Sequence, residues 1–522
     1  MDKNENINES IYKTICPGCN IGCGLYIREL NHSNSENNYS NKLFLEYRKP
    51  DPINEGKLCH FGVHLCEYYN NCFKDQKIIL DKVNEFTKIL NSYSNESIEF
   101  INIGNVTNEE HISFMNLAKL KNKNVNTFTN SIFEKIGKFH ISTNISYNQI
   151  LNFKKIYLFG DLSIQYPLII RYLIKARNNG SEIISFGVKS LSFTSKHIFI
   201  DENESLYDIK DFNPDSDTLI ISDFSFYSNI KRIVEILEFI NTKKSKKLFL
   251  KPFVNSSGIS YFSKHTNQKS IEEILKLINE NIVKVIICLE SDIVGLSLDP
   301  SIKDILKKLD HLIVISSSIT DTYNLATLKI NIDPFYKRYG TVINSEKRLI
   351  SQYKLTEPKN KENMLFNLIQ TLIQKIGGKM ETMDDVESQI IKELNIELNE
   401  KVKDPIIIDK NNSDLCIKEK ISGNIEQAYS TKEENHIKHL YLFSPYYWMS
   451  TNKYKDIVEI NEKIIHELGI LKNNTINISC SCLNTNEKSR YKISNIKEDY
   501  IISWNKKNYS KKAFSFVLVT KE

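Results

Sequence analysis

The sequence has no apolar run of about 18 residues, the length that a membrane-spanning helix needs, so we expect no membrane span. It also lacks a strong excess of either charge. The net charge is +5 over 522 residues and the lysines are spread evenly, which argues against a nucleic-acid partner. The N-terminus, M-D-K-N-E-N-I-N-E-S, contains neither an apolar core nor twin arginines. Nothing there indicates export, and we expect a cytoplasmic protein.

The cysteines carry the most informative pattern in the chain. In a sequence without an export signal, cysteines are expected to be reduced thiols or metal ligands rather than disulfides. One set reads C-x2-C-x3-C and is followed by a distant fourth cysteine: Cys16, Cys19, Cys23 and Cys59. Three thiolates from one tight loop and a fourth from elsewhere can converge on the iron corners of a cubane 4Fe-4S cluster. We therefore expect these side chains to be metal ligands.

A structural zinc site is the main alternative for the same cysteines, because four thiolates also suit zinc. Zinc ligands usually come as two pairs of close cysteines, whereas the grouping here is three plus one. The spacing therefore favours the iron–sulfur cluster over zinc, and it favours a disulfide framework least.

Residues 76–377 alternate short apolar strands with amphipathic helices. This alternation predicts parallel sheets with helices on both faces, and sites in such sheets lie beyond the carboxyl ends of the strands. The strands are expected at residues 98–104, 156–160, 182–187, 218–222, 247–250, 283–289 and 311–316. Residues 378–435 are polar and irregular and predict a linker. The last part, 436–522, is rich in strands, with one helix expected at about 458–468.

Further motifs follow the cysteines in a fixed order along the chain. They are V-T-N-E-E at 106–110, Y-L-F-G-D at 157–161, N-S-S-G at 255–258, T-D-T-Y-N-L-A at 320–326, G-T-V-I-N-S-E-K-R at 340–348 and E-L-G-I at 467–470. Together with the cysteine pattern, these segments resemble the molybdopterin oxidoreductase family. The resemblance is closest to the catalytic (alpha) subunit of formate dehydrogenases.

The resemblance implies an α/β fold class with a fixed division into domains. A small N-terminal 4Fe-4S domain would occupy residues 1–75. Two interleaved parallel-sheet α/β domains would fill 76–377, roughly 76–130 with 251–377, and 131–250. After the linker at 378–435, a C-terminal, β-barrel-like domain that resembles a dinucleotide-binding module would span 436–522.

The resemblance also implies a bis-molybdopterin guanine dinucleotide that holds molybdenum or tungsten. Two-electron chemistry on a small substrate, formate or similar, would send electrons through the cluster to an iron–sulfur or flavin subunit. The residues that the motifs assign to cofactor binding are Gly160, Asn255, Gly340, Thr341, Asn344, Glu346 and Arg348. Backbone N–H groups after Gly160 would suit a pyrophosphate, and Gly340 would let the backbone approach the cofactor closely. By themselves, Glu346 and Arg348 would form a surface ion pair.

The chain departs from the family where the chemistry would take place. Phe61 stands where family enzymes often have a lysine between cluster and pterin, and phenylalanine donates no hydrogen bond. Residues 122–150 contain no cysteine to ligate the metal, and Ser131 and His140 there are better explained as ordinary loop residues. Gly187 replaces the aspartate that commonly reads the guanine. No catalytic residue is identified.

These departures leave two further functions open. The chain could be a non-catalytic electron-transfer or scaffold subunit that keeps the cluster and has lost the pterin. It could also be a zinc-stapled interaction protein. Metal analysis separates all three functions, because they imply molybdenum or tungsten with iron, iron alone, or zinc alone.

Overall fold

The structure is a computed structural model, and it describes residues 7–32, 42–74, 76–127, 143, 145–200, 204–223, 245–263, 266–296, 301–396, 406–407, 437–441, 457–467, 475–480, 485–494, 496, 500–503 and 514–521. The chain forms two compact units, each made of separate stretches of sequence. Unit 1 is Met1–Thr129, Phe253–Gly295 and Lys303–Lys410. Unit 2 is Asn130–Pro252, Leu296–Ile302 and Asn411–Glu522. The two units are described separately below.

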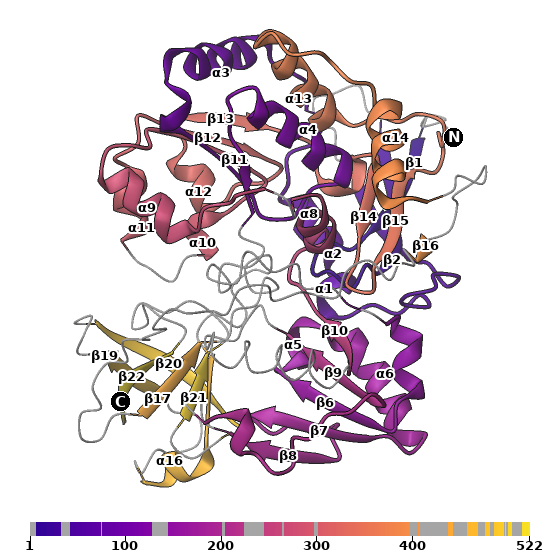
Figure 1. Cartoon of the computed structure of the whole chain (residues 1–522), viewed down its shortest axis with the longest axis vertical. Coiled ribbons are helices and arrows are strands. Elements are labelled where there is room, and N and C mark those ends of the chain that lie inside the picture. The colour runs from indigo at the N-terminus through magenta and orange to yellow at the C-terminus, as the bar shows by residue number, and fades with distance from the viewer. Residues whose placement is uncertain are drawn as a thin grey trace, which may run out of the picture. The chain divides into compact units, whose positions relative to one another are not determined.

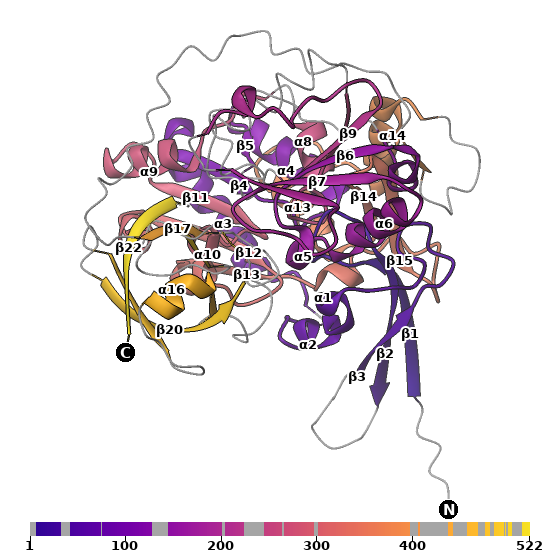
Figure 2. The ribbon, with the colours of Figure 1, turned by 90° about the horizontal axis from the view of Figure 1, so that it is seen from below.

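The first sheet of unit 1 contains the two strands that flank the loop with Cys16, Cys19 and Cys23. Its antiparallel strands are β1 (Ile7–Ile15), β2 (Gly24–His32), β3 (Lys42–Tyr47), β14 (Gly340–Ile343) and β15 (Arg348–Lys354), in the order β14-β15-β1-β2-β3. Figure 2 shows β1, β2 and β3 side by side near the N-terminus. The short helices α1 (His60–Val63) and α2 (Leu65–Asn70) follow the fourth cysteine. The G-T-V-I-N-S-E-K-R motif thus forms a hairpin that joins the sheet of the N-terminal domain.

The second sheet of unit 1 is parallel. Its strands are β4 (Ile98–Asn102), β5 (Val125–Asn126), β11 (Val285–Leu289), β12 (His311–Ser316) and β13 (Leu328–Asn331), in the order β13-β12-β11-β4-β5. All residues of β4 and β11 are buried, as continuous apolar strands covered on both faces should be. The helices around this sheet are α3 (Leu80–Ser92), α4 (Asn108–Lys119), α8 (Ser256–Phe262), α9 (Ile271–Asn279), α10 (Ile293–Leu296), α11 (Ile302–Leu306), α12 (Asp321–Leu325), α13 (Met364–Lys375) and α14 (Met383–Leu394) (Figure 1).

One prediction for this unit is wrong. The linker expected at 378–435 begins with helix α14, and β16 (Ile406–Ile407) pairs with β15. Thr382 and Asp385 form a capping box at the start of α14, while Val386, Ile390 and Leu394 pack into the hydrophobic core. An apolar stripe at every fourth residue is enough to bury a helix whose other faces are polar.

Unit 2 contains the third sheet, which is also parallel. Its strands are β6 (Lys155–Phe159), β7 (Glu182–Gly187), β8 (Lys196–Phe199), β9 (Thr218–Ser222) and β10 (Lys246–Phe249), in the order β10-β9-β6-β7-β8. The helices after β6 are α5 (Leu162–Gln165) and α6 (Pro167–Asn178). Proline at the first position of α6 suits a helix start, because the missing N–H would have no partner inside the helix.

The rest of unit 2 is a closed β-barrel. Its strands are β17 (Ile437–Tyr441), β18 (Ile457–Ile460), β19 (Ile476–Cys480), β20 (Thr485–Ile493), β21 (Tyr500–Ser503) and β22 (Phe514–Lys521). The helix expected at 458–468 is only partly correct, since α16 (Glu462–Glu467) is preceded by strand β18. Apolar Val458 and Ile460 lie two residues apart on one face of this strand, and both are fully buried. The predicted fold class, α/β with a small N-terminal domain and a C-terminal barrel, is confirmed.

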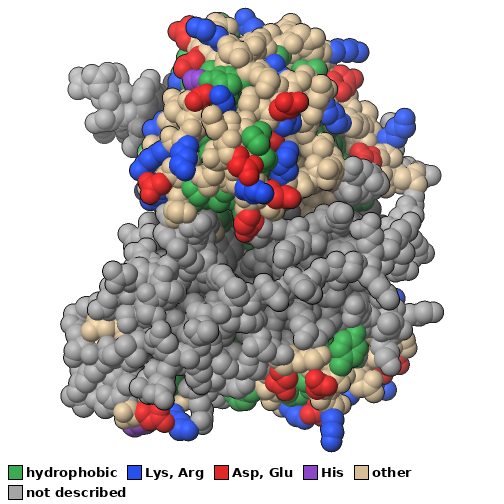
Figure 3. Space-filling model, turned by 60° about the vertical axis from the view of Figure 1, so that its left-hand side comes forward, with side chains coloured by type: hydrophobic (Ala, Val, Ile, Leu, Met, Phe, Trp, Pro, Cys, Tyr) green, Lys and Arg blue, Asp and Glu red, His purple; other side chains and the backbone are tan. Residues whose placement is uncertain are grey.

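The surface of unit 1 carries mixed charges. On the face shown in Figure 3, basic and acidic side chains alternate rather than gather into a patch of one sign. In the part of the chain that the structure describes, no helix is both long and apolar enough to cross a membrane.

Candidate functional site

The four motif cysteines come together in unit 1. The loop between β1 and β2 carries three of them, and the main-chain N–H of Cys16 donates to the carbonyl of Cys23 over 2.9 Å. Burial, and then the nearby Cys59 and Cys19, raise the pKa of the Cys16 thiol well above its usual value. The pKa of Cys23 is raised by burial and by the other three thiols. The four sulfurs are therefore close enough to interact electrostatically, and none of them is in a disulfide.

This group of thiols fits a 4Fe-4S cluster. Buried thiols that disfavour one another's ionisation need positive charge nearby to become thiolates, and iron supplies it.

Asn20, inside the cysteine loop, is a hub of hydrogen bonds and is fully buried. Its amide nitrogen donates to the carbonyl oxygens of Val254 over 2.5 Å and of Ile343 over 3.0 Å. Its amide oxygen accepts from the hydroxyls of Ser257 over 2.6 Å and of Ser345 over 3.1 Å. One short side chain thus joins the cysteine loop to the N-S-S-G turn and to the β14–β15 hairpin.

Asn344, in the β14–β15 turn, also forms a hydrogen bond with the cysteine loop. Its amide nitrogen donates to the carbonyl of Ile21 over 2.8 Å, and its oxygen accepts from the main-chain N–H groups of Glu346 and Arg348. The Arg348 Nε lies 2.5 Å from Glu346 Oε1, with side chains only 11% and 2% exposed. Glu346 and Arg348 thus form an ion pair, but the pair is buried rather than on the surface.

Gly340 and Thr341 pack against the start of α4. Gly340 has φ +150°, and a Cβ atom there would lie 2.6 Å from a Glu109 carboxylate oxygen and 2.8 Å from Thr107. Thr341 donates to Glu109 through its main-chain N–H and its hydroxyl, over 2.8 and 2.7 Å. Burial raises the pKa of Glu109 to about 7, although the bonds from Thr341 act in the opposite direction. The close backbone approach at Gly340 is thus to α4.

Asn255 begins helix α8 and connects three segments. Its amide nitrogen donates to Asn108 Oδ1 over 2.9 Å, and its oxygen accepts from the main-chain N–H of Ile343 over 2.9 Å. Of the residues of unit 1 that the motifs assigned to the cofactor, Asn344 contacts the cysteine loop, whereas Gly340 and Thr341 contact the start of α4. Their role in cofactor binding stays a prediction. Ser131 and His140 lie outside the described residues.

Phe61 forms an apolar wall of the cysteine loop. It is 4% exposed, and a Cβ atom on Gly18 would lie 2.4 Å from its ring. The Tyr68 ring lies 6.0 Å from the Phe61 ring between centroids. The position of the family's lysine is therefore filled by an aromatic packing contact.

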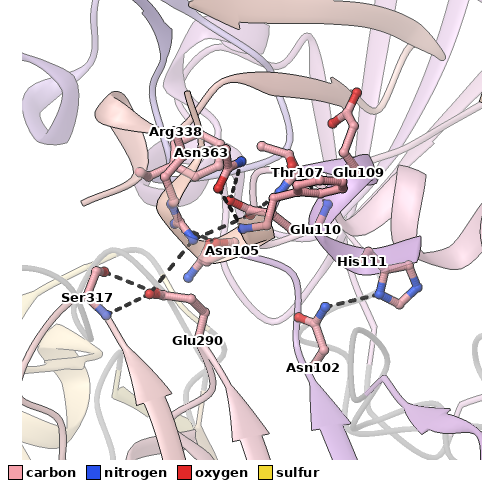
Figure 4. Close-up of polar contacts among 12 residues, drawn as sticks. Asn102, Asn105, Thr107, Glu109, Glu110, His111, Glu290, Ser317, Arg338 and Asn363 are labelled. Carbon is pink, nitrogen blue, oxygen red and sulfur yellow. Dashed lines mark hydrogen bonds and ion pairs between the residues drawn. The ribbon is translucent and has the colours of Figure 1, made fainter. Parts of the chain in front are cut away.

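The sequence analysis missed a buried polar network at the carboxyl ends of β4, β11 and β12 (Figure 4). Arg338, only 1% exposed, places Nη1 3.4 Å from a Glu110 carboxylate oxygen and 4.0 Å from Glu290. Its Nη2 donates to the carbonyl of Asn105 over 3.2 Å. Glu290 accepts from the main-chain N–H and the hydroxyl of Ser317. The adjacent V-T-N-E-E and G-T motifs pointed to these segments, but not to Arg338.

Polar atoms near this network lack partners. Among the described residues, Arg338 Nε, Asn105 Oδ1 and Tyr69 Oη are buried without a hydrogen bond. The strand order of the sheet reverses between β4 and β11, the point at which α/β sheets bind ligands. Buried polar groups are rarely left unpaired, so these atoms fit a polar ligand in unit 1.

At the strand-order reversal of the unit 2 sheet, the end of β6 leads through a tight turn into a capped helix. Gly160 has φ +107° at the end of β6, as a tight strand-to-helix turn requires. The next residue, Asp161, caps α5 by accepting from the main-chain N–H of Ser163 over 2.9 Å, and its other oxygen lies 2.6 Å from Lys189 Nζ. A carboxylate thus lies at the helix start where a pyrophosphate was expected, and the role of Gly160 in cofactor binding stays a prediction.

Comparisons with known proteins address the fold and the N-terminal domain. Residues 9–71 match the molybdopterin oxidoreductase Fe4S4 domain. No curated protein sequence matches the chain. Among solved structures, acetylene hydratase from Pelobacter acetylenicus is similar with a TM-score of 0.61 and 10% identity, over 95% of this chain and 93% of that one.

A second similar structure is the formyltransferase/hydrolase complex (FhcABCD) from Methylorubrum extorquens, in complex with methylofuran. Its TM-score is 0.43 at 11% identity, over 58% of this chain and 97% of that one, and it supports no conclusion. The likeness to acetylene hydratase shows a shared fold over nearly the whole chain. The matched residues 9–71 contain all four motif cysteines. Residues 9–71 are thus similar to the molybdopterin oxidoreductase Fe4S4 domain, and this match supports a 4Fe-4S cluster as the cofactor of the N-terminal domain.

Proposed function

We propose that the chain is an iron–sulfur oxidoreductase in which Cys16, Cys19, Cys23 and Cys59 hold a 4Fe-4S cluster that transfers single electrons. The observation that carries this proposal is the grouping of the four thiols inside the matched domain. Cys16 and Cys23 are buried, whereas Cys19 and Cys59 are partly exposed. The partly exposed pair marks the side from which an electron-accepting iron–sulfur or flavin subunit would approach.

The protein residues around the cluster have separate tasks. Asn20 and Asn344 fix the path of the cysteine loop through bonds to distant segments. Phe61 excludes water from one side of the loop, since its ring is buried against Gly18. Low water access and fixed thiolate positions are the means by which a protein tunes a cluster's reduction potential.

We also propose that unit 1 holds the pterin part of the cofactor. A molybdopterin guanine dinucleotide with molybdenum or tungsten would supply two-electron chemistry on a small substrate. Arg338, Asn105 and Tyr69 support this placement, because they offer unpartnered donor and acceptor atoms at the reversal point of the sheet. Formate as the substrate rests on the sequence resemblance alone.

Metal analysis tests the proposal. The full chain, purified anaerobically, should contain about four irons, as a cubane requires, and give a paramagnetic signal on reduction. Cys16→Ser and Cys59→Ser should remove that signal. Cys66→Ser is the matched control, because Cys66 lies on α2 in the same domain but outside the cysteine motif. Stoichiometric zinc without iron after anaerobic reconstitution would contradict the proposal.

An electron-transfer or scaffold subunit without the pterin is the second candidate. The observations that favour it are the buried Phe61 at the family's lysine position and the capped helix start at Asp161. Iron without molybdenum or tungsten, even from a native host supplied with both metals, would select this function over the first.

A further inference from the structure

The sheet of unit 2 has its own reversal point. In the order β10-β9-β6-β7-β8, the chain runs outward from β6 in one direction and from β9 in the other. Nucleotides bind to such sheets at the carboxyl ends of the two strands that flank the reversal. The residues at this point are Gly160 and Asp161 after β6, and Asp223 after β9.

One main-chain group at this helix start, the N–H of Ser163, already has a side-chain partner. Asp161 accepts from both the main-chain N–H and the hydroxyl of Ser163, over 2.9 and 2.5 Å. The helix that follows, α5, has only four residues, so its macrodipole is weak. A pyrophosphate would have to displace a carboxylate that is covalently part of the same turn.

The same carboxylate belongs to a buried group of charges. Lys189 lies 2.6 Å from Asp161 and 2.9 Å from Glu459, which comes from barrel strand β18. The three side chains are 15%, 4% and 5% exposed. Two carboxylates therefore face one ammonium, and Asp223, itself 1% exposed, lies beyond Gly160 in the same turn region. Additional negative charge from phosphates would be repelled.

The guanine end of a dinucleotide would also lack its usual partner. Gly187, at the end of β7 with φ +149°, stands where the family's motif has the aspartate that reads the guanine. Lys189, two residues later, is a cation that could bind a phosphate, but its ammonium group already forms ion pairs with Asp161 and Glu459.

We infer that unit 2 binds no pterin dinucleotide at this point of its sheet, and that Lys189, Asp161 and Glu459 take its place as a buried ion triad joining sheet to barrel. Of the two reversal points in the parallel sheets that the structure describes, only the one in unit 1 then remains for such a dinucleotide. This inference goes beyond the proposed function, and it holds whether or not unit 1 carries a pterin.

The first test counts nucleotides. The full chain, purified anaerobically from a host that makes the pterin cofactor, is hydrolysed with acid, and the released guanosine monophosphate is measured per chain. No more than one per chain supports the inference, and two per chain overturns it. Iron is measured in the same sample, so that absence of the cluster, which would contradict the proposed function, is recognised separately.

The second test asks whether the triad is structural. Lys189→Met leaves two buried carboxylates facing each other, and should lower the thermal midpoint of the apo chain by about 5 °C or more. The control is Lys155→Met in the same sheet, whose partner Glu182 is 3.8 Å away and half exposed. Exposed ion pairs contribute little to stability, so the thermal midpoint of the control variant should fall by about 1 °C or less. Equal shifts in both variants would contradict the inference.

Discussion

The side-chain amide of Asn344 donates a hydrogen bond to the main-chain carbonyl of Ile21, 323 residues earlier in the sequence. This bond, with those of Asn20, fastens the cysteine loop to a hairpin formed much later in the chain. The conformation of the cysteine loop therefore depends on contacts with residues 340–348, and we expect changes in that hairpin to affect the cluster.

Asn20→Ala should lower both the cluster content and the stability of the protein. It removes a side chain with four hydrogen-bonded contacts and leaves buried carbonyls and hydroxyls unpaired. Each such group costs about 1–3 kcal/mol. Iron per chain and urea unfolding would measure the effect. The matched control is Asn71→Ala, an exposed asparagine with one bond to Glu67. Similar iron content in both variants would show that Asn20 does not position the loop.

Gly340→Ala should destabilise unit 1 by crowding. The new Cβ would lie 2.6 Å from Glu109 and 2.8 Å from Thr107. Gly377→Ala is the control, because it also has a positive φ, +89°, but no atom within 4 Å of the added Cβ. Backbone strain costs both variants about 1 kcal/mol, so the excess loss in Gly340→Ala, about 1–3 kcal/mol, reports the contact with α4. Equal losses would exclude that contact.

Glu109→Gln should change the pH dependence of stability. The pKa of Glu109 is raised to about 7 from 4.5, so the folded state binds more protons than the unfolded state between these values. Its contribution therefore stabilises below about pH 4.5 and is lost as pH rises to about 7, by about 1.4 kcal/mol per pH unit. Relative to wild type, Glu109→Gln should gain stability as pH rises across this range. Parallel curves from urea unfolding would contradict the assignment.

Arg338→Met should be strongly destabilising, by about 3–5 kcal/mol, because it leaves Glu110 and Glu290 without their buried cation. Lys276→Met provides the comparison. Its partner Glu280 lies 3.7 Å away and both side chains are exposed, so a loss below about 1 kcal/mol is expected. Chemical denaturation of the two variants decides whether the Arg338 network supports unit 1.

The parallel sheets could be predicted from sequence because their central strands are almost entirely buried. Strands such as β6, β9 and β11 are short, continuous apolar runs between helical segments, and their predicted positions are close to the observed ones. The start of helix α4 is likewise encoded locally, since Thr107 and Glu110 form the capping box that begins it. The cysteine spacing predicted the Fe4S4 domain for a similar local reason.

Long-range partners could not be predicted in this way. No local pattern states that Asn20 contacts Ile343, or that Glu459 of the barrel pairs with Lys189. The assignment of residues 340–348 to cofactor contacts came from motif resemblance, whereas the bonds of Asn344 and Thr341 to protein groups require the assembled unit. Amphipathic α14 was missed because its stripe of buried residues is narrow and its composition polar.

The iron content of the anaerobically purified protein decides whether the four motif cysteines hold a 4Fe-4S cluster. About four irons per chain are expected, with a paramagnetic signal on reduction that is lost in Cys16→Ser and kept in Cys66→Ser. One zinc per chain with no iron, or an unchanged iron signal in Cys16→Ser, would contradict this expectation.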